Sequence, residues 1–199
     1  IADTWHGVTS IESMIVADVR LPRALLALLV GGTLGLAGAA LQGMLRNPLA
    51  EPGIIGVSNG AALGAVVVFY FGFAAQGWFM LPLGGLLGAG LSVLCLALLV
   101  RGNSNVLTLI LAGIAINAIG GALIALALNF APSPYAMQEI VYWLLGSVTN
   151  RSLHDVAIAL PFMVGGWLLM LGCGRYLDAL TLGEDTAQSL GFNVRRLRW

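Results

Sequence analysis

The chain has 199 residues, of which 59% are hydrophobic and only 9% are charged, and its nine positive and nine negative side chains cancel. A soluble domain carries about 25% charged residues, so this composition excludes a water-soluble enzyme, and zero net charge leaves no electrostatic footprint for nucleic acid. The chain contains no lysine, which a P-loop requires, so any work derived from ATP must come from another chain.

Five apolar runs are each long enough to cross a membrane as one helix. They contain 20–24 residues, against the ~20 needed for a hydrocarbon core about 30 Å thick. Charged side chains are confined to their ends, because a charge at the bilayer centre costs roughly 2.5–3.5 kcal/mol on insertion scales. The sequence therefore predicts an all-α, polytopic integral membrane protein, a single domain with spans at about 24–45, 54–73, 79–100, 106–129 and 153–173.

The arginines predict how these spans are oriented. With residue 1 outside, six of the nine lie on the cytoplasmic side, as the positive-inside tendency requires: Arg46, Arg101, Arg175, Arg195, Arg196 and Arg198. Three lie outside: Arg20, Arg23 and Arg151. Residues 101–105 and 174–199 are then predicted to be cytoplasmic, and residues 1–20 and 131–138 external.

Glycines recur at one-turn intervals within the spans, which predicts faces for close helix packing. The sets are Gly31 and Gly35, then Gly56, Gly60 and Gly64, then Gly84 and Gly88.

Eight polar residues fall inside the predicted spans, and two interpretations of them stay open. One is hydrogen bonding between helices, and the other is a neutral polar lining for a transport pathway. No carboxylate lies in the middle of a span, which argues against a proton- or sodium-coupled carrier. The residues are Thr33, Gln42, Ser58, Asn59, Ser92, Thr108, Asn117 and Asn129.

Two segments between the spans depart from simple turns. Residues 46–53 hold Pro48 and Pro52, which forbid a continuous helix and predict a stiff cytoplasmic connection. In residues 130–152, Pro132 and Pro134 end the fourth span, and residues 138–146 predict a short outer-face or re-entrant helix. Ser152 and Asp155 have the spacing of a capping box that starts the last span.

The polar C-terminal stretch predicts a helix of about two turns over residues 183–191. Thr181 and Glu184 have capping-box spacing, Glu184 and Asp185 suit the positive end of the helix dipole, and Gly191 is the predicted stop. So short a helix is not stable alone, so it is predicted to dock on a soluble partner. Its predicted shared apolar face consists of Leu182, Ala187 and Leu190.

Titratable side chains give no sign of a metal or cofactor site. His6 and His154 lie at predicted outer edges, Cys95 and Cys173 lie in apolar runs, and no cluster has metal-ligand spacing. An integral membrane enzyme, the alternative class, needs convergent titratable groups in a membrane cavity, and the sequence offers none.

Several motifs, in order along residues 18–198, resemble the FecCD-type permeases of ABC importers for ferric siderophores, haem and cobalamin. They are RLPR at 20–23, GAALQG at 38–43, NPLAEPGIIGVSNGA at 47–61, YWLLGS at 142–147 and LTLGEDTAQSLG at 180–191.

The resemblance implies a ten-helix permease fold, of which this chain would be a piece without the first helix and the last four. It implies a homodimer in the bacterial inner membrane, with ATPase subunits on the cytoplasmic face and a periplasmic binding protein outside. A ferric siderophore is the first expected cargo, then haem, then cobalamin.

The resemblance also implies roles for particular residues. Asn47, Pro48 and Leu49 correspond to the cytoplasmic gate, Arg20 and Arg23 to the surface that meets the binding protein, and the span holding Thr108 and Asn117 to the pathway lining. The residues that match the coupling helix, which contacts the ATPase, are Leu182, Gly183, Glu184, Asp185, Ala187, Leu190 and Gly191.

Overall fold

The computed structural model describes residues 11–101, 106–131 and 133–191, and in these ranges every regular element is helical, which confirms the all-α prediction. The predictions for His6, Pro132, Arg195, Arg196 and Arg198 fall outside these ranges, as do the side chains of Glu184 and Asp185. The α-helices are α2 (Ile11–Met14), α3 (Leu21–Leu45), α4 (Val57–Tyr70), α5 (Met80–Val100), α6 (Val106–Asn129), α7 (Pro134–Leu145), α8 (Leu153–Gly172), α9 (Gly174–Thr181) and α10 (Glu184–Ser189).

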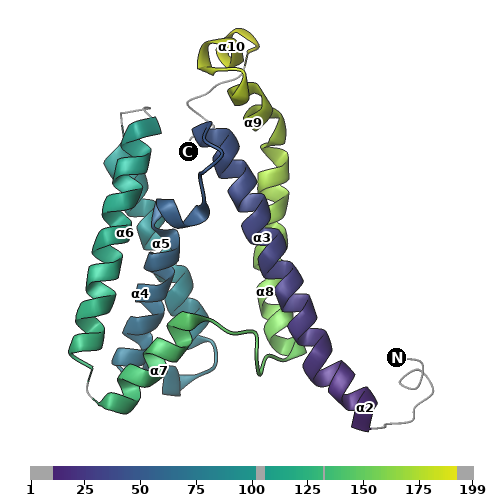
Figure 1. Ribbon diagram of the computed structural model, residues 1–199, viewed down its shortest axis with the longest axis vertical. Coiled ribbons are helices and arrows are strands. Elements are labelled where there is room, and N and C mark those ends of the chain that lie inside the picture. The colour runs from purple at the N-terminus through teal and green to yellow at the C-terminus, as the bar shows by residue number, and fades with distance from the viewer. Residues whose placement is uncertain (1–10, 102–105, 132, 192–199) are drawn as a thin grey trace.

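The helices form two groups (Figure 1). In one group α8 and α9 run beside α3, and in the other α4 packs against α5 and α6, with α7 across its lower end. Residues 46–56 connect the groups near one end, and residues 146–152 connect them near the other. Because α3 and α9 both reach the upper end, the segment after α3 and the helix α10 lie at the same end of the molecule (Figure 1).

Glycines bring the backbones of α4 and α5 together. A Cβ on Gly60 would lie 2.7 Å from the carbonyl oxygen of Gly88, and a Cβ on Gly84 would lie 2.8 Å from that of Gly64. These distances leave no room for a side chain, so the predicted small-residue faces of α4 and α5 are confirmed. The same prediction for α3 stays a prediction, because no described element comes within 4 Å of a Cβ placed on Gly31 or Gly35.

The contact between α3 and α8 combines an apolar core with one polar link. Leu26, Leu29 and Val156 are buried together. Beside them, the indole Nε1 of Trp167 donates a hydrogen bond to Thr33 Oγ1 at 2.9 Å, and Thr33 Oγ1 donates to the carbonyl of Leu29 at 2.7 Å. Thr33 therefore accepts the indole N–H across the contact of two helices. Of the two interpretations left open for the polar residues, this is hydrogen bonding between helices.

The second predicted span, 54–73, is helical over a shorter stretch. Helix α4 has 14 residues, about 21 Å, and a 3-10 turn over Pro52–Ile55 precedes it. Gly56 separates the two with a left-handed backbone, φ 80°. Pro52 occupies the first position of this turn, where its missing amide needs no partner. The left-handed Gly56 then ends the turn, so α4 begins only at Val57.

This irregular segment is packed against protein. A Cβ on Gly113 of α6 would lie 2.6 Å from the carbonyl oxygen of Ile54, and Gly113 lies seven residues after Val106, the first residue of α6. The 3-10 turn therefore sits about 10 Å along α6. Irregular backbone is tolerated at membrane depth only when protein covers it or it lines a cavity, and α6 provides that cover.

The first helix starts earlier than position 24. Residues Ile11–Leu45 form one helical stretch of 35 residues, about 52 Å long and longer than the ~30 Å hydrocarbon core. Pro22 falls inside it, directly after a π-helical segment over Ile15–Arg20, where Leu21 N donates to the carbonyl of Val16. A proline disrupts regular α-helical bonding, and a π-helical turn is one way for a helix to continue past it.

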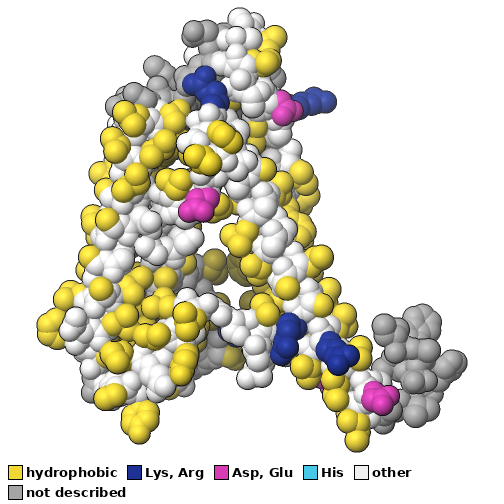
Figure 2. Space-filling model, in the orientation of Figure 1, with side chains coloured by type: hydrophobic (Ala, Val, Ile, Leu, Met, Phe, Trp, Pro, Cys, Tyr) yellow, Lys and Arg dark blue, Asp and Glu magenta, His cyan; other side chains and the backbone are white. Residues whose placement is uncertain are grey.

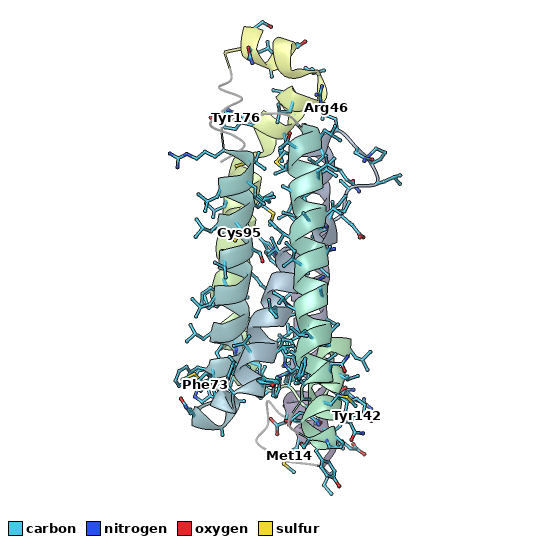
Figure 3. The ribbon with its side chains drawn as sticks, turned by 90° about the vertical axis from the view of Figure 1, so that its left-hand side faces the viewer. Met14, Arg46, Phe73, Cys95, Tyr142 and Tyr176 are labelled. Atoms are coloured by element: carbon cyan, nitrogen blue, oxygen red, sulfur yellow. The ribbon has the colours of Figure 1, made fainter. Side chains whose placement is uncertain are left out.

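Among the described residues, four helical stretches are long and apolar enough to cross a membrane, namely Ile11–Leu45, Met80–Val100, Val106–Asn129 and Leu153–Gly172. Figure 2 shows hydrophobic side chains exposed along both groups, with the basic side chains near the two ends. Arg46 and Tyr176 lie near one end, and Met14, Phe73 and Tyr142 near the other (Figure 3).

Candidate functional site

Residues 46–50 form a compact turn at the upper end of α3. Arg46 adopts a left-handed backbone, φ 48°, and ends the helix. Asn47 then organises the turn, because its Oδ1 accepts from the amide of Leu49 at 2.9 Å and its carbonyl accepts from the amide of Ala50 at 3.1 Å. The stiffness predicted from the two prolines is therefore reinforced by an Asn side chain, which commonly forms such turns.

The last turn of α3 holds this loop through Gln42. Its backbone carbonyl accepts from the amide of Asn47 at 3.2 Å, and its side-chain Nε2 donates to the carbonyl of Pro48 at 3.0 Å. Ala50 is buried, whereas the side chain of Leu49 is 83% exposed. The loop thus presents an apolar side chain at a tip that is fixed on both sides.

Beyond the loop, Gly56 anchors the chain on α6. A Cβ at this position would lie 2.9 Å from Ile116 Cγ2 and 3.1 Å from the backbone nitrogen of Asn117. With its positive φ, this close approach makes glycine the residue that fits. The loop is therefore attached to α3 on one side and to α6 on the other.

Asn117 and Thr108, the predicted pathway residues, are both half-buried on α6. The carbonyl of Asn117 accepts a hydrogen bond from Asn59 Nδ2 at 3.1 Å, across the α4–α6 contact. Asn59 therefore also joins two helices, like Thr33. Thr108 lies in the first turn of α6, away from the Asn59 contact.

The C-terminal helices correct two predictions. Thr181 does not cap α10, because it is the last residue of α9 and its hydroxyl donates to the carbonyl of Asp178 at 2.6 Å. The N-cap is Gly183, φ 107°, with no side-chain bond. The predicted stop at Gly191, φ 86°, is confirmed, and its amide donates to the carbonyl of Gln188 at 2.9 Å.

The predicted shared face of Leu182, Ala187 and Leu190 is wrong. Ala187 is 1% exposed and packs with Ala179 and Leu180, whereas Leu182 and Leu190 are 65% and 58% exposed. Leu182 directly follows α9 as its C-cap and does not belong to α10. The buried alanine therefore attaches α10 to α9, and the two leucines lie outside this contact.

Helix α9 in turn rests on the end of α3. A Cβ on Gly43 would lie 3.6 Å from Leu177 Cβ, and α9 lies beside α3 at the upper end of the molecule (Figure 1). The last turn of α3 therefore contacts both the loop at 46–50 and α9.

Arg20 and Arg23 are exposed at the opposite end of the long first helix. At that end, the predicted capping box of α8 is confirmed, because Asp155 Oδ2 accepts from Ser152 N at 2.8 Å and Ser152 Oγ from Asp155 N at 3.4 Å. Arg151 lies 3.9 Å from Asp155 in an exposed ion pair, which contributes little to stability.

Helix α7 also lies at this end, and it begins four residues before the predicted short helix. Ser133 is its N-cap and accepts from the amide of Ala136 at 3.1 Å, and Pro134 follows at the first position. Proline is favoured there because its missing N–H needs no partner. Ile140 is buried, and Trp143 makes an edge contact with Phe69 of α4.

Sequence reasoning missed one contact between the two helix groups. The ring of His154, at the start of α8, packs edge to face against the ring of Trp78, with the two ring centroids 4.8 Å apart. The residues are far apart in sequence, and no spacing rule links them. In the part of the chain that the structure describes, no three His, Cys, Asp or Glu side chains form a group that could hold a metal ion.

Comparison with known proteins decides the family. The sequence profile of the FecCD transport family matches residues 1–199. The chain belongs to the FecCD transport family. The resemblance drawn from the separate motifs is therefore confirmed.

Several known permeases are similar along nearly all of this chain. The chain is 43% identical over 187 residues to the uncharacterized ABC transporter permease protein YvrB of Bacillus subtilis, covering 92% of this chain and 52% of YvrB. It is 35% identical to the vitamin B12 import system permease protein BtuC of Vibrio cholerae, and the match covers 96% of this chain and 57% of BtuC. It is 38% identical to the ferric enterobactin transport system permease protein FepD of Escherichia coli, and the match covers 94% of this chain and 56% of FepD. The chain thus spans a little over half the length of these relatives.

A solved structure has the same fold. It shows an inward-facing conformation of a transporter assigned to the metal-chelate type of ABC transporters, with 31% sequence identity and a TM-score of 0.85. The match covers 96% of this chain and 61% of that one. This FecCD chain is accordingly an all-helical, multi-pass membrane protein.

Proposed function

We propose that this chain is part of the permease of a binding-protein-dependent ABC importer, which moves a ferric siderophore across the bacterial inner membrane. The observation that carries the proposal is the arrangement at the upper end, where the loop at 46–50 and the α9–α10 pair share the last turn of α3. A loop and a docking helix on one shared support are suited to transmit a movement.

In this proposal α10 contacts a separate ATPase subunit on the cytoplasmic side. The exposed leucines, Leu182 and Leu190, provide the apolar contact, while Ala187 keeps α10 attached to α9. The whole proposed contact comprises Leu182, Gly183, Glu184, Asp185, Ala187, Leu190 and Gly191. A helix of six residues has too little internal stability to stand alone, so binding to a partner would also order it.

The same proposal assigns Asn47, Pro48 and Leu49 to the cytoplasmic gate of a homodimer. The exposed side chain of Leu49 would meet its counterpart from the second copy near the two-fold axis. Thr108 and Asn117 would line the pathway on α6. The hydrogen bond from the Asn59 side chain to the carbonyl of Asn117 supports a fixed position for that part of the helix.

At the outer end, Arg20 and Arg23 would meet acidic residues of the binding protein. Both are exposed and belong to one continuous helix, three residues apart, so they share a face. The alternative role is anchoring the helix at lipid headgroups. Changing both to Glu separates the two roles, since a docking role predicts slower association of the binding protein with a weaker salt dependence.

The cargo is the finer part of the proposal. A ferric siderophore is supported by similarity to FepD, and cobalamin is the second candidate because permeases named for vitamin B12 or cobalamin import are 35% and 37% identical to this chain. Relatives named for hemin and molybdate transport, 35% and 34% identical, extend the panel to test.

ATP hydrolysis by the reconstituted complex tests the proposed function. The full-length protein is placed in proteoliposomes with its ATPase subunit, and the binding protein loaded with each cargo is added. The loaded binding protein should stimulate hydrolysis, and Leu190→Asp should abolish this stimulation while the protein still inserts. Tyr135→Asp, which also places a charge on an exposed side chain but at the opposite end, is the matched control. Stimulation unchanged by Leu190→Asp contradicts the coupling role.

A further inference from the structure

Gln42 is the side chain of α3 that reaches across to the loop at 46–50. Its Nε2 donates to the carbonyl of Pro48 at 3.0 Å, and its own backbone carbonyl accepts from Asn47 at 3.2 Å. We propose that Gln42 is a positioning residue, which fixes the loop tip and makes it follow the last turn of α3. This inference rests on the proposed role of the loop as a gate.

The loop is able to move as one unit under this control. Asn47 closes it internally through its bonds to the amides of Leu49 and Ala50. Pro48 has a fixed φ and no amide to donate, so its carbonyl is the polar group through which it is held. A bond at that carbonyl, one residue before Leu49, therefore determines where the exposed leucine points.

The adjacent residue connects this support to the coupling helices. Gly43 follows Gln42 and points about 100° away around the helix, where it lies against Leu177 of α9. Helix α9 is joined to α10 by the buried cluster of Ala179, Leu180 and Ala187. A displacement of α10 would therefore reach Gln42 through one turn of α3, and the bond to Pro48 would pass it to the loop.

Two variants of Gln42 separate this role from simple packing. Gln42→Met keeps the length of the side chain but cannot donate, and Gln42→Lys retains a donor that can reach a carbonyl. The control is Gln138→Met, because Gln138 Nε2 also donates an exposed hydrogen bond, to Tyr142 Oη at 3.2 Å, but at the opposite end.

Cross-linking of the gate measures the effect. The full-length transporter with Leu49→Cys is assembled with its ATPase, and the yield of disulfide between the two copies is compared without nucleotide and with trapped ATP. The ratio of the two yields should fall about two- to tenfold in Gln42→Met, the range that one net hydrogen bond supplies. Gln138→Met should keep the parental ratio, and Gln42→Lys should recover most of it.

A general structural defect would lower the cross-linking yield in both states and leave their ratio unchanged. Gln42→Glu gives a second test if Gln42→Met inserts poorly, since it keeps the length but presents a carboxylate to the Pro48 carbonyl, and its ratio should fall at least as far. A parental ratio in Gln42→Met or Gln42→Glu overturns the positioning role while leaving the gate intact. Failure of the parent Leu49→Cys protein to cross-link in either state overturns the gate itself, and this inference with it.

Discussion

Replacing Gly88 with alanine should separate α4 from α5. A Cβ on Gly88 would lie 3.0 Å from the carbonyl carbon of Gly60 and 3.0 Å from Gly64 Cα, and it would overlap the carbonyl oxygen of Gly60. All of these atoms belong to the backbone of α4. No rotamer change can relieve the contact, so one of the two helices must shift.

The size of the effect follows from two opposing contributions. Overpacking of a tight contact costs about 1–3 kcal/mol, and the backbone overlap at Gly88 favours the upper end of that range. Alanine in place of glycine within a helix gains roughly 0.5–1 kcal/mol. The expected net loss is therefore about 2 kcal/mol, which is more than tenfold in the unfolding equilibrium.

Gly90 on the same helix is the matched control, because a Cβ there would meet no atom of a neighbouring element within 4 Å. Gly90→Ala should be neutral or stabilising by up to about 1 kcal/mol. The assay is unfolding of the full-length protein in mixed micelles by added SDS, followed by far-UV circular dichroism. Equal midpoints for Gly88→Ala and Gly90→Ala would refute the close approach of the two backbones.

The same unfolding assay tests three other contacts. Gly56→Ala should destabilise by about 2–4 kcal/mol, because alanine is strained at φ 80° and its Cβ would lie 2.9 Å from Ile116 Cγ2; a loss below half of that range would argue against the contact with α6. Thr33→Val and Trp167→Phe should each destabilise, with a coupling energy of about 0.5–1.5 kcal/mol in a double-mutant cycle, and additive effects would show that the bond is absent. Ser152→Ala should cost about 1 kcal/mol and speed amide exchange in the first turn of α8; unchanged exchange would contradict the capping box.

The sequence predicted features that depend on local chemistry. Apolar runs without central charge identified the membrane-crossing character, because burying a charge in lipid is unfavourable for any fold. Glycine spacing predicted the small-residue faces at which α4 and α5 meet, since only small residues let two helix backbones approach, although it did not show that these two helices pair. The capping box at Ser152 followed from two residues that are close in sequence.

Features that depend on long-range packing were not predictable in this way. The spacing of Thr181 and Glu184 suited a capping box, but Thr181 is the last residue of the preceding helix, where its hydroxyl donates to the carbonyl of Asp178. The run at 54–73 is long and mostly apolar, yet the left-handed Gly56 separates its first residues, which form a 3-10 turn against α6, from the α-helix that follows. The bond from Gln42 to Pro48 depends on how the loop turns back on α3, which residue spacing does not reveal.

Uptake into proteoliposomes tests the central claim most directly. The full-length protein and its ATPase are reconstituted with ATP trapped in the lumen, and the binding protein loaded with a labelled ferric siderophore is supplied outside. We expect the label to accumulate in the lumen only when both luminal ATP and the binding protein are present. Equal accumulation without ATP or without the binding protein would contradict the account, as would no accumulation of this or any other cargo in the panel.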